Sequence, residues 1–109
     1  MSDKAKKLSD LMRIGAKAGN QLYFNLMDEN KNSCAVGAII IGAYPDVRSG
    51  YGEAHFKWAE LVDRFNTAKR IMNPVTGLHD SVTCVIIDLN NKNKWTREKI
   101  ADWLESIGY

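Results

Sequence analysis

The side chains best suited to chemistry in this chain are its two cysteines and two histidines: Cys34, Cys84, His55 and His79. Cys34 lies where we expect a helix to begin, and a helix N-terminus favours the thiolate form that attacks electrophiles. With His55 or His79 as its base, this thiolate could serve a hydrolase or a transferase. The small neighbours Ala35 and Gly37 favour the alternative, a cysteine that only packs, so we expect a protein without catalysis.

Two patterns in the sequence could bind a metal ion. The cysteines and histidines could supply four zinc ligands, but their spacing matches no compact zinc motif. Residues 28–33, Asp-Glu-Asn-Lys-Asn-Ser, begin like a calcium loop, with oxygen ligands at the first, third and fifth positions. Such a loop needs glycine at its sixth position and glutamate at its twelfth, where this chain has Ser33 and Ile39. We therefore expect a polar turn there, and neither a metal ion nor a cofactor.

A basic segment in the last fifth of the chain could contact nucleic acid. It combines cations that could bind phosphates with a ring that could stack on a base: Lys92, Lys94, Trp95 and Arg97. The alternative is a solvated turn between two helices. Glu98, Asp102 and Glu105 lie along one side of the helix that follows and would repel phosphate. The formal net charge of +2 is also too small to indicate an obligate nucleic-acid binder.

Length and composition define the broad class of the protein. The 109 residues suffice for one domain with a single core. Apolar residues make up 45% and charged residues 26%, as in ordinary soluble globular proteins. The N-terminal residues are charged, and the longest apolar run is shorter than the roughly 20 residues that span a bilayer. We therefore expect a cytosolic protein with no membrane partner and with both cysteines as free thiols.

The apolar run from Cys34 to Ala43 is the stretch around which we expect the domain to be built. Its alanines favour a helix, and the hydroxyl group of Ser33 could cap the first free amides of that helix. Gly37 would let a neighbouring backbone approach closely. Three consecutive isoleucines support the alternative of a buried strand. We favour a central buried helix.

Apolar residues at helical spacing predict three further helices, over residues 4–17, 55–72 and 96–106. Thr96 is placed to cap the last of them. The buried face of that helix is expected to consist of apolar residues three and four positions apart: Ile100, Trp103, Leu104 and Ile107.

The remaining segments are less regular. Residues 81–90 are rich in β-branched side chains, yet their apolar stripe also fits a helix, which we favour. Partial alternation predicts a short strand over residues 21–27, and glycine and proline predict a surface loop over residues 44–54. The whole pattern predicts a mainly α fold, a compact bundle of four or five helices with or without one short β-hairpin.

Two segments carry a resemblance to a known family. Residues 33–38 read Ser-Cys-Ala-Val-Gly-Ala, and residues 89–91, Leu-Asn-Asn, precede an amphipathic helix that follows Trp95. The pair resembles a family of small uncharacterised phage and prophage proteins, which have a Cys-Ala-Leu-Gly-Ala-like helix and a later Leu-Asn-Asp segment. Asn91 stands where that pattern tends to have aspartate, so no carboxylate carries over. The resemblance implies a phage accessory protein in the bacterial cytoplasm and supplies no settled activity.

We therefore expect a protein that acts by binding another protein, either of the host or of a defence system. The expected contacts come from the loop 44–54 and the exposed side of the final helix: Arg48, Tyr51, Glu53, Glu98, Asp102 and Glu105. Two alternatives stay open, nucleic-acid binding through residues 92–99 and a cysteine-dependent enzyme. The sequence is also compatible with a homodimer.

Overall fold

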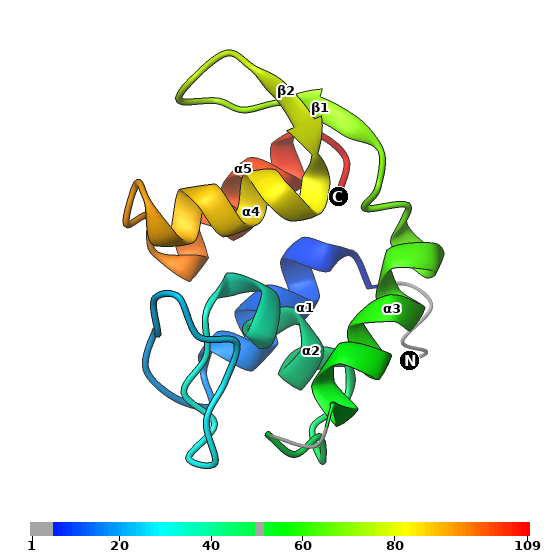
Figure 1. The fold of residues 1–109 in the computed structure, drawn as a ribbon, viewed down its shortest axis with the longest axis vertical. Coiled ribbons are helices and arrows are strands. Elements are labelled where there is room, and N and C mark those ends of the chain that lie inside the picture. The colour runs from blue at the N-terminus through cyan, green and yellow to red at the C-terminus, as the bar shows by residue number, and fades with distance from the viewer. Residues whose placement is uncertain (1–5, 50–51) are drawn as a thin grey trace.

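The computed structural model describes residues 6–49 and 52–109, which form five helices and one β-hairpin (Figure 1). The elements in chain order are α1 (Leu8–Ala16), α2 (Ala35–Ala43), α3 (Glu53–Phe65), β1 (Arg70–Met72), β2 (His79–Ser81), α4 (Val82–Asn91) and α5 (Arg97–Ser106). The two strands pair antiparallel, with Ile71 opposite Asp80. The predicted mainly α fold with a short hairpin is confirmed.

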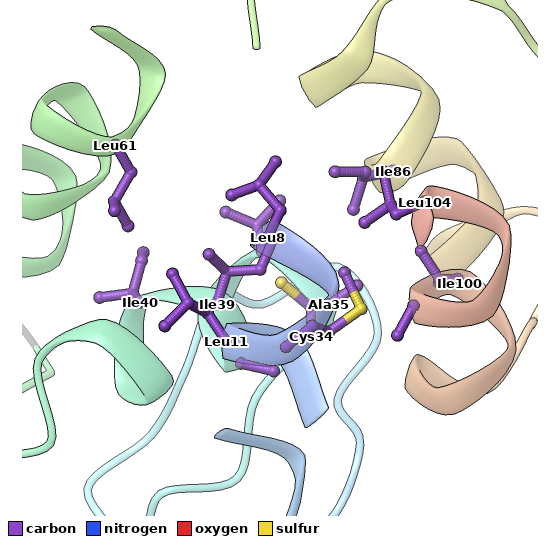
Figure 2. Packing of buried hydrophobic residues seen from close by; sticks show 14 of the residues in the cluster. Leu8, Leu11, Cys34, Ala35, Ile39, Ile40, Leu61, Ile86, Ile100 and Leu104 are labelled. Atoms are coloured by element: carbon purple, nitrogen blue, oxygen red, sulfur yellow. The ribbon is translucent and has the colours of Figure 1, made fainter. Parts of the chain in front are cut away.

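All five helices contribute to one hydrophobic core. Figure 2 shows Leu8 of α1, Ile39 of α2, Leu61 of α3, Ile86 of α4 and Leu104 of α5 directed towards this core. Each of these five side chains is fully buried. The apolar run predicted as the central helix thus forms α2, and its residues from Ala35 to Ile41 are all buried.

α1 packs directly against α2, and glycines make this close approach possible. A methyl group on Gly15 of α1 would lie 1.7 Å from the carbonyl oxygen of Ala38. A methyl group on Gly42 of α2 would lie 2.0 Å from the carbonyl oxygen of Leu11. The predicted close approach at Gly37 is also present, because a methyl group there would lie 2.0 Å from the carbonyl oxygen of Leu26. The backbones therefore touch at positions where only glycine fits.

The first residues of α2 differ from the sequence prediction. Cys34, and not Ser33, is the N-cap: its backbone is extended, and its sulfur accepts a hydrogen bond from the amide of Gly37 at 3.4 Å. The Ser33 side chain is fully buried and accepts a hydrogen bond from Arg97. The cap shifts by one residue because Ser33 is already engaged in this contact between segments.

The cap of α5 has the predicted form, and a serine hydroxyl also caps α4. Residues 82–91 form a helix, as favoured from the sequence, and the Ser81 hydroxyl accepts a hydrogen bond from the amide of Cys84 at 3.1 Å. The Thr96 hydroxyl accepts one from the amide of Lys99 at 3.1 Å. A side-chain oxygen at the N-cap satisfies an amide that has no partner within the helix.

The predicted buried face of α5 is correct in part. Ile100 and Leu104 are fully buried, whereas Trp103 is only partly buried and Ile107 is 41% exposed. Ile107 lies past the last helical residue, Ser106, where the backbone has left the helical path. The periodicity of the helix therefore no longer directs this side chain towards the core.

Two other predicted elements are wrong in extent or type. The helix predicted over residues 55–72 ends at Phe65, because Asn66 takes the left-handed backbone conformation that closes a helix. The strand predicted over residues 21–27 is absent from the described chain, where only isolated bridges to Ser33 occur. Phe24 has a φ of 65°, which breaks the extended path of that segment.

Candidate functional site

A pocket of about 270 Å³ opens between four segments of the chain. Its walls come from residues 24–26, the beginning of α2, the first half of α3 and the end of α4. The lining is mostly apolar and consists of Phe24, Asn25, Leu26, Cys34, Val36, His55, Trp58, Ile87 and Asn91. Convergence of distant segments on one apolar hollow makes this pocket the candidate functional site.

Phe24 is the most unusual residue of the pocket. Its side chain is 72% exposed, although it is a large apolar ring, and its backbone is in the left-handed region. A left-handed backbone costs about 1 kcal/mol or more for a residue other than glycine. The Phe24 amide donates a hydrogen bond of 2.8 Å to Oδ1 of Asn91, which holds this conformation. The backbone conformation of Phe24 thus lowers the stability of the fold, and it places an aromatic ring beside an apolar pocket.

Behind the pocket, a network of amide side chains fixes the segments that form it. Asn90 accepts hydrogen bonds through Oδ1 from the amide of Ala35 at 3.0 Å and from Nε2 of Gln21 at 2.8 Å. Its Nδ2 donates to the carbonyl oxygen of Leu22 and to Oδ1 of Asn91. The Asn90 side chain is buried, so these bonds form away from water. The network holds the residues before Phe24 against the first turn of α2 and the last turn of α4.

Arg97 extends this network, and its position corrects an expectation from the sequence. Arg97 as a whole is 6% exposed, and its guanidinium donates to both oxygens of Ser33 and to the carbonyl oxygens of Ala16 and Gly19. Burial lowers the pKa of the guanidinium below its ordinary value. The carbonyl groups at the end of α1 carry the negative end of a helix dipole, which compensates the charge. Arg97 is therefore an internal clamp and not part of a phosphate-binding surface.

The other members of the predicted basic segment are also engaged. Lys92 lies 3.7 Å from the carboxylate of Asp88, and the Lys94 ammonium lies 4.2 Å from the centre of the Tyr23 ring. Trp95, which was expected to stack on a base, is partly buried against the core, and Lys99 lies over its ring. Nucleic-acid binding through residues 92–99 thus lacks the guanidinium and the free ring on which the hypothesis depended.

The structure brings two of the four chemically reactive side chains to one place. Cys34 and His55 both line the pocket, whereas His79 lies on β2 and Cys84 is exposed on α4. Burial raises the pKa of the Cys34 thiol above its ordinary value of 9.0, so the thiol stays protonated at neutral pH. Within residues 6–49 and 52–109, no group of three histidine, cysteine, aspartate or glutamate side chains has an arrangement that could hold a metal ion.

The two thiols should therefore react at very different rates. With iodoacetamide at pH 8, we expect Cys84 to react first and Cys34 to react at least about tenfold more slowly, because Cys34 is buried and protonated. Intact-mass spectrometry over time measures both reactions, and the Cys34→Ser and Cys84→Ser variants assign them. In denaturant both should react alike. Faster reaction at Cys34 than at Cys84 in the folded protein would instead indicate an activated nucleophile.

Residues 28–32 form the polar turn that the sequence predicts. The Asp28 carboxylate accepts hydrogen bonds from the amides of Asn30 and Asn32 and from the side-chain amide of Asn32. These bonds lower the pKa of the Asp28 carboxyl group below its ordinary value of 3.8, with the Asn32 side chain as the largest cause. The Lys31 ammonium donates to the carbonyl oxygens of Pro45 and Val47, which ties the turn to the segment that follows α2.

The residues predicted to bind a protein fall into two separate places. Arg48 is highly exposed and lies 3.5 Å from Glu53, the first residue of α3, while Tyr51 lies outside the described residues. On α5, Asp102 and Glu105 bind the guanidinium of Arg13 at 2.8 and 2.7 Å, and Glu98 is exposed. Figure 1 shows α5 and the segment before α3 towards opposite ends of the molecule. The structure therefore does not join them into one surface.

Sequence reasoning did not find the pocket, although two signals were present. Tyr23 and Phe24 form an aromatic pair in a short segment between helices, where exposed rings are unusual. Trp58 belongs to the apolar residues at helical spacing in residues 55–72, and in the structure it is only partly buried and lines the pocket. Comparisons with protein-family models, with curated proteins and with solved structures found no match to this chain.

Proposed function

We propose that the protein acts by binding another protein, and that the pocket beside Phe24 receives an apolar side chain of the partner. The observation that carries this proposal is the exposed Phe24 ring, held in a costly backbone conformation at the edge of an apolar hollow. Exposed aromatic rings next to a pocket are typical of interface residues that contribute most of the binding energy. Strain at such a position points to function.

The size of the pocket supports a side chain as its occupant. Pockets for small molecules and cofactors usually have volumes of about 300–1,000 Å³. The present pocket, at about 270 Å³, lies just below that range. The buried and protonated Cys34 thiol supports binding without catalysis, because the thiolate is the reactive form. The resemblance to phage and prophage proteins supports a bacterial protein, of the host or of a defence system, as the partner in the cytoplasm.

Two phenylalanine variants test the pocket as the binding surface. Phe24 and Phe56 are 72% and 75% exposed, but only Phe24 lines the pocket, so Phe56 is a matched control. We expect Phe24→Ala to lose a captured bacterial partner and Phe56→Ala to retain it. Affinity capture followed by titration with the purified partner measures the change, which should be about 2 kcal/mol or more for Phe24→Ala.

The same capture distinguishes the pocket from the loop predicted from the sequence. If the pocket binds the partner, the Arg48→Ala, Tyr51→Ala double variant should retain it. Equal binding by wild type and Phe24→Ala, together with loss in the double variant, would place the contact on the loop and contradict the pocket.

A further inference from the structure

We infer that the partner segment carries a carboxylate next to the apolar side chain that enters the pocket. This inference rests on the proposed function and adds the chemistry of the bound segment. Lys94 provides the charge: its ammonium lies 4.2 and 4.9 Å from the ring centres of Tyr23 and Phe24. Within the part of the chain that the structure describes, no carboxylate pairs with it. A cation is thus held over the rings at the edge of the pocket.

The pocket itself also favours an acidic partner. None of its lining residues is acidic, and Asn91 and His55 are among those that offer hydrogen-bond donors. Asn91 uses Oδ1 for the Phe24 amide and for Asn90, which leaves its Nδ2 free of other described residues. The His55 ring is exposed and binds no other residue of the ranges 6–49 and 52–109. A carboxylate could accept hydrogen bonds from either group.

Asp88 is the acidic residue closest in sequence to a residue of the pocket, and its charge does not oppose the binding of an acidic partner. Asp88 follows Ile87 on α4, and its carboxylate is paired with Lys92 at 3.7 Å. The charge of Lys94 has no such partner among the described residues. A partner segment with an aspartate or glutamate beside a bulky apolar residue therefore fits this site. The apolar side chain suits the pocket, and the carboxylate complements the charge of Lys94 at its edge.

Three synthetic peptides test this chemistry without a known partner. Each has a central Phe-Leu pair, flanked on both sides by glutamates, by glutamines or by lysines. Amide resonances of the ¹⁵N-labelled protein, at low salt, report binding at residues 24–26 and 34–36. We expect the glutamate peptide to bind about fivefold more tightly than the glutamine peptide, as for an exposed ion pair, and the lysine peptide to bind most weakly.

Charge variants of the protein complete the test. We expect Lys94→Glu to invert the order of the glutamate and lysine peptides, and Lys94→Gln to make them equal. Lys99→Glu is the matched control, because Lys99 lies over a different ring, that of Trp95, and should leave the order unchanged. Dispersed wild-type resonances elsewhere in each spectrum verify that the variants fold.

The outcomes separate this inference from the function on which it rests. If all three peptides shift the pocket resonances with equal affinity, or if Lys94→Glu leaves their order unchanged, the acidic preference is overturned and the pocket stands. If no peptide shifts these resonances at millimolar concentration, the pocket does not take apolar side chains, and both proposals fail.

Discussion

Gly15→Ala should destabilise the protein by about 3 kcal/mol, although the same change in an ordinary helix stabilises by about 1 kcal/mol. Alanine favours the helical backbone more than glycine does, and Gly15 lies within α1. The added methyl group, however, would lie 1.7 Å from the carbonyl oxygen of Ala38. Both atoms belong to helices, so α1 and α2 must separate to relieve the overlap. The core between them then loses contacts.

Thermal and urea denaturation measure this effect. For a chain of this length, we expect the melting temperature to fall by about 15 °C. Gly42→Ala should behave similarly, because its methyl group would lie 2.0 Å from the carbonyl oxygen of Leu11. Since both changes separate the same two helices, the double variant should lose less than the sum.

Gly77→Ala is the control for loss of glycine alone. Gly77 has a φ of 76°, but nothing lies within 4 Å of an added methyl group. Its replacement should cost about 1 kcal/mol through backbone strain only. Unchanged or higher stability for Gly15→Ala would show that the helices are not in backbone contact.

The α1–α2 contact illustrates how much of the fold the sequence predicts. The small residues of the central run indicated that another backbone comes close, and the structure confirms this at Gly37. The partner there is the loop carbonyl of Leu26, and the helix contact uses Gly15 and Gly42 instead. Composition indicates close packing, but only the three-dimensional arrangement decides which segment meets which glycine.

The candidate site was harder to predict because its parts are far apart in the sequence. Hydrophobic periodicity describes one helix at a time, whereas the pocket joins residues 24–26 to α2, α3 and α4. The position of Phe24 depends on its left-handed backbone and on Asn91, which is 67 residues away. Asn66 is similar: it ends α3 by its backbone conformation, while the apolar spacing continues to Met72.

Arg97 is the opposite case. Its spacing along the sequence indicates a buried position, although the basic residues around it suggest an exposed one. Arg97, Ile100, Ala101 and Leu104 stand at helical positions i, i+3, i+4 and i+7, the spacing of one buried face. All four are buried in α5. The lysines nearby made Arg97 resemble part of a basic surface. An arginine on an apolar stripe with no carboxylate at helical spacing instead favours a buried clamp.

Replacement of Arg97 by methionine, which keeps much of the apolar stem, should cost about 3 kcal/mol. The guanidinium donates to three buried oxygens, two on Ser33 and one on Ala16, and to the partly buried carbonyl oxygen of Gly19. Without it the Ser33 hydroxyl oxygen and the carbonyl oxygens of Ala16 and Gly19 lose this donor, whereas the Ser33 carbonyl oxygen keeps the amide of Leu22. Each unsatisfied buried group costs about 1–3 kcal/mol. Relief of the buried charge offsets part of that loss, since burial already lowers the pKa of the guanidinium.

Arg13→Met is the matched control for this prediction. Arg13 binds Asp102 and Glu105 at 2.8 and 2.7 Å, but its partners are exposed. Exposed ion pairs contribute about 1 kcal/mol or less. Replacement of Arg97, which has no carboxylate partner, should therefore cost more stability than replacement of Arg13, which pairs with Asp10, Asp102 and Glu105. Urea denaturation of both variants decides this. An Arg13→Met loss equal to or larger than that of Arg97→Met would contradict the clamp.

Arg97→Lys separates charge from geometry at the same position. Lysine retains a positive charge, but its ammonium has three donors on one nitrogen and cannot reach as far as the planar fork of arginine. We expect this variant to recover less than half of the stability that methionine loses. The Phe24 resonances should also shift in both variants, because the Arg97 guanidinium holds Ser33, whose carbonyl oxygen accepts a hydrogen bond from the amide of Leu22, two residues before Phe24. Full rescue by lysine would mean that charge alone stabilises this junction.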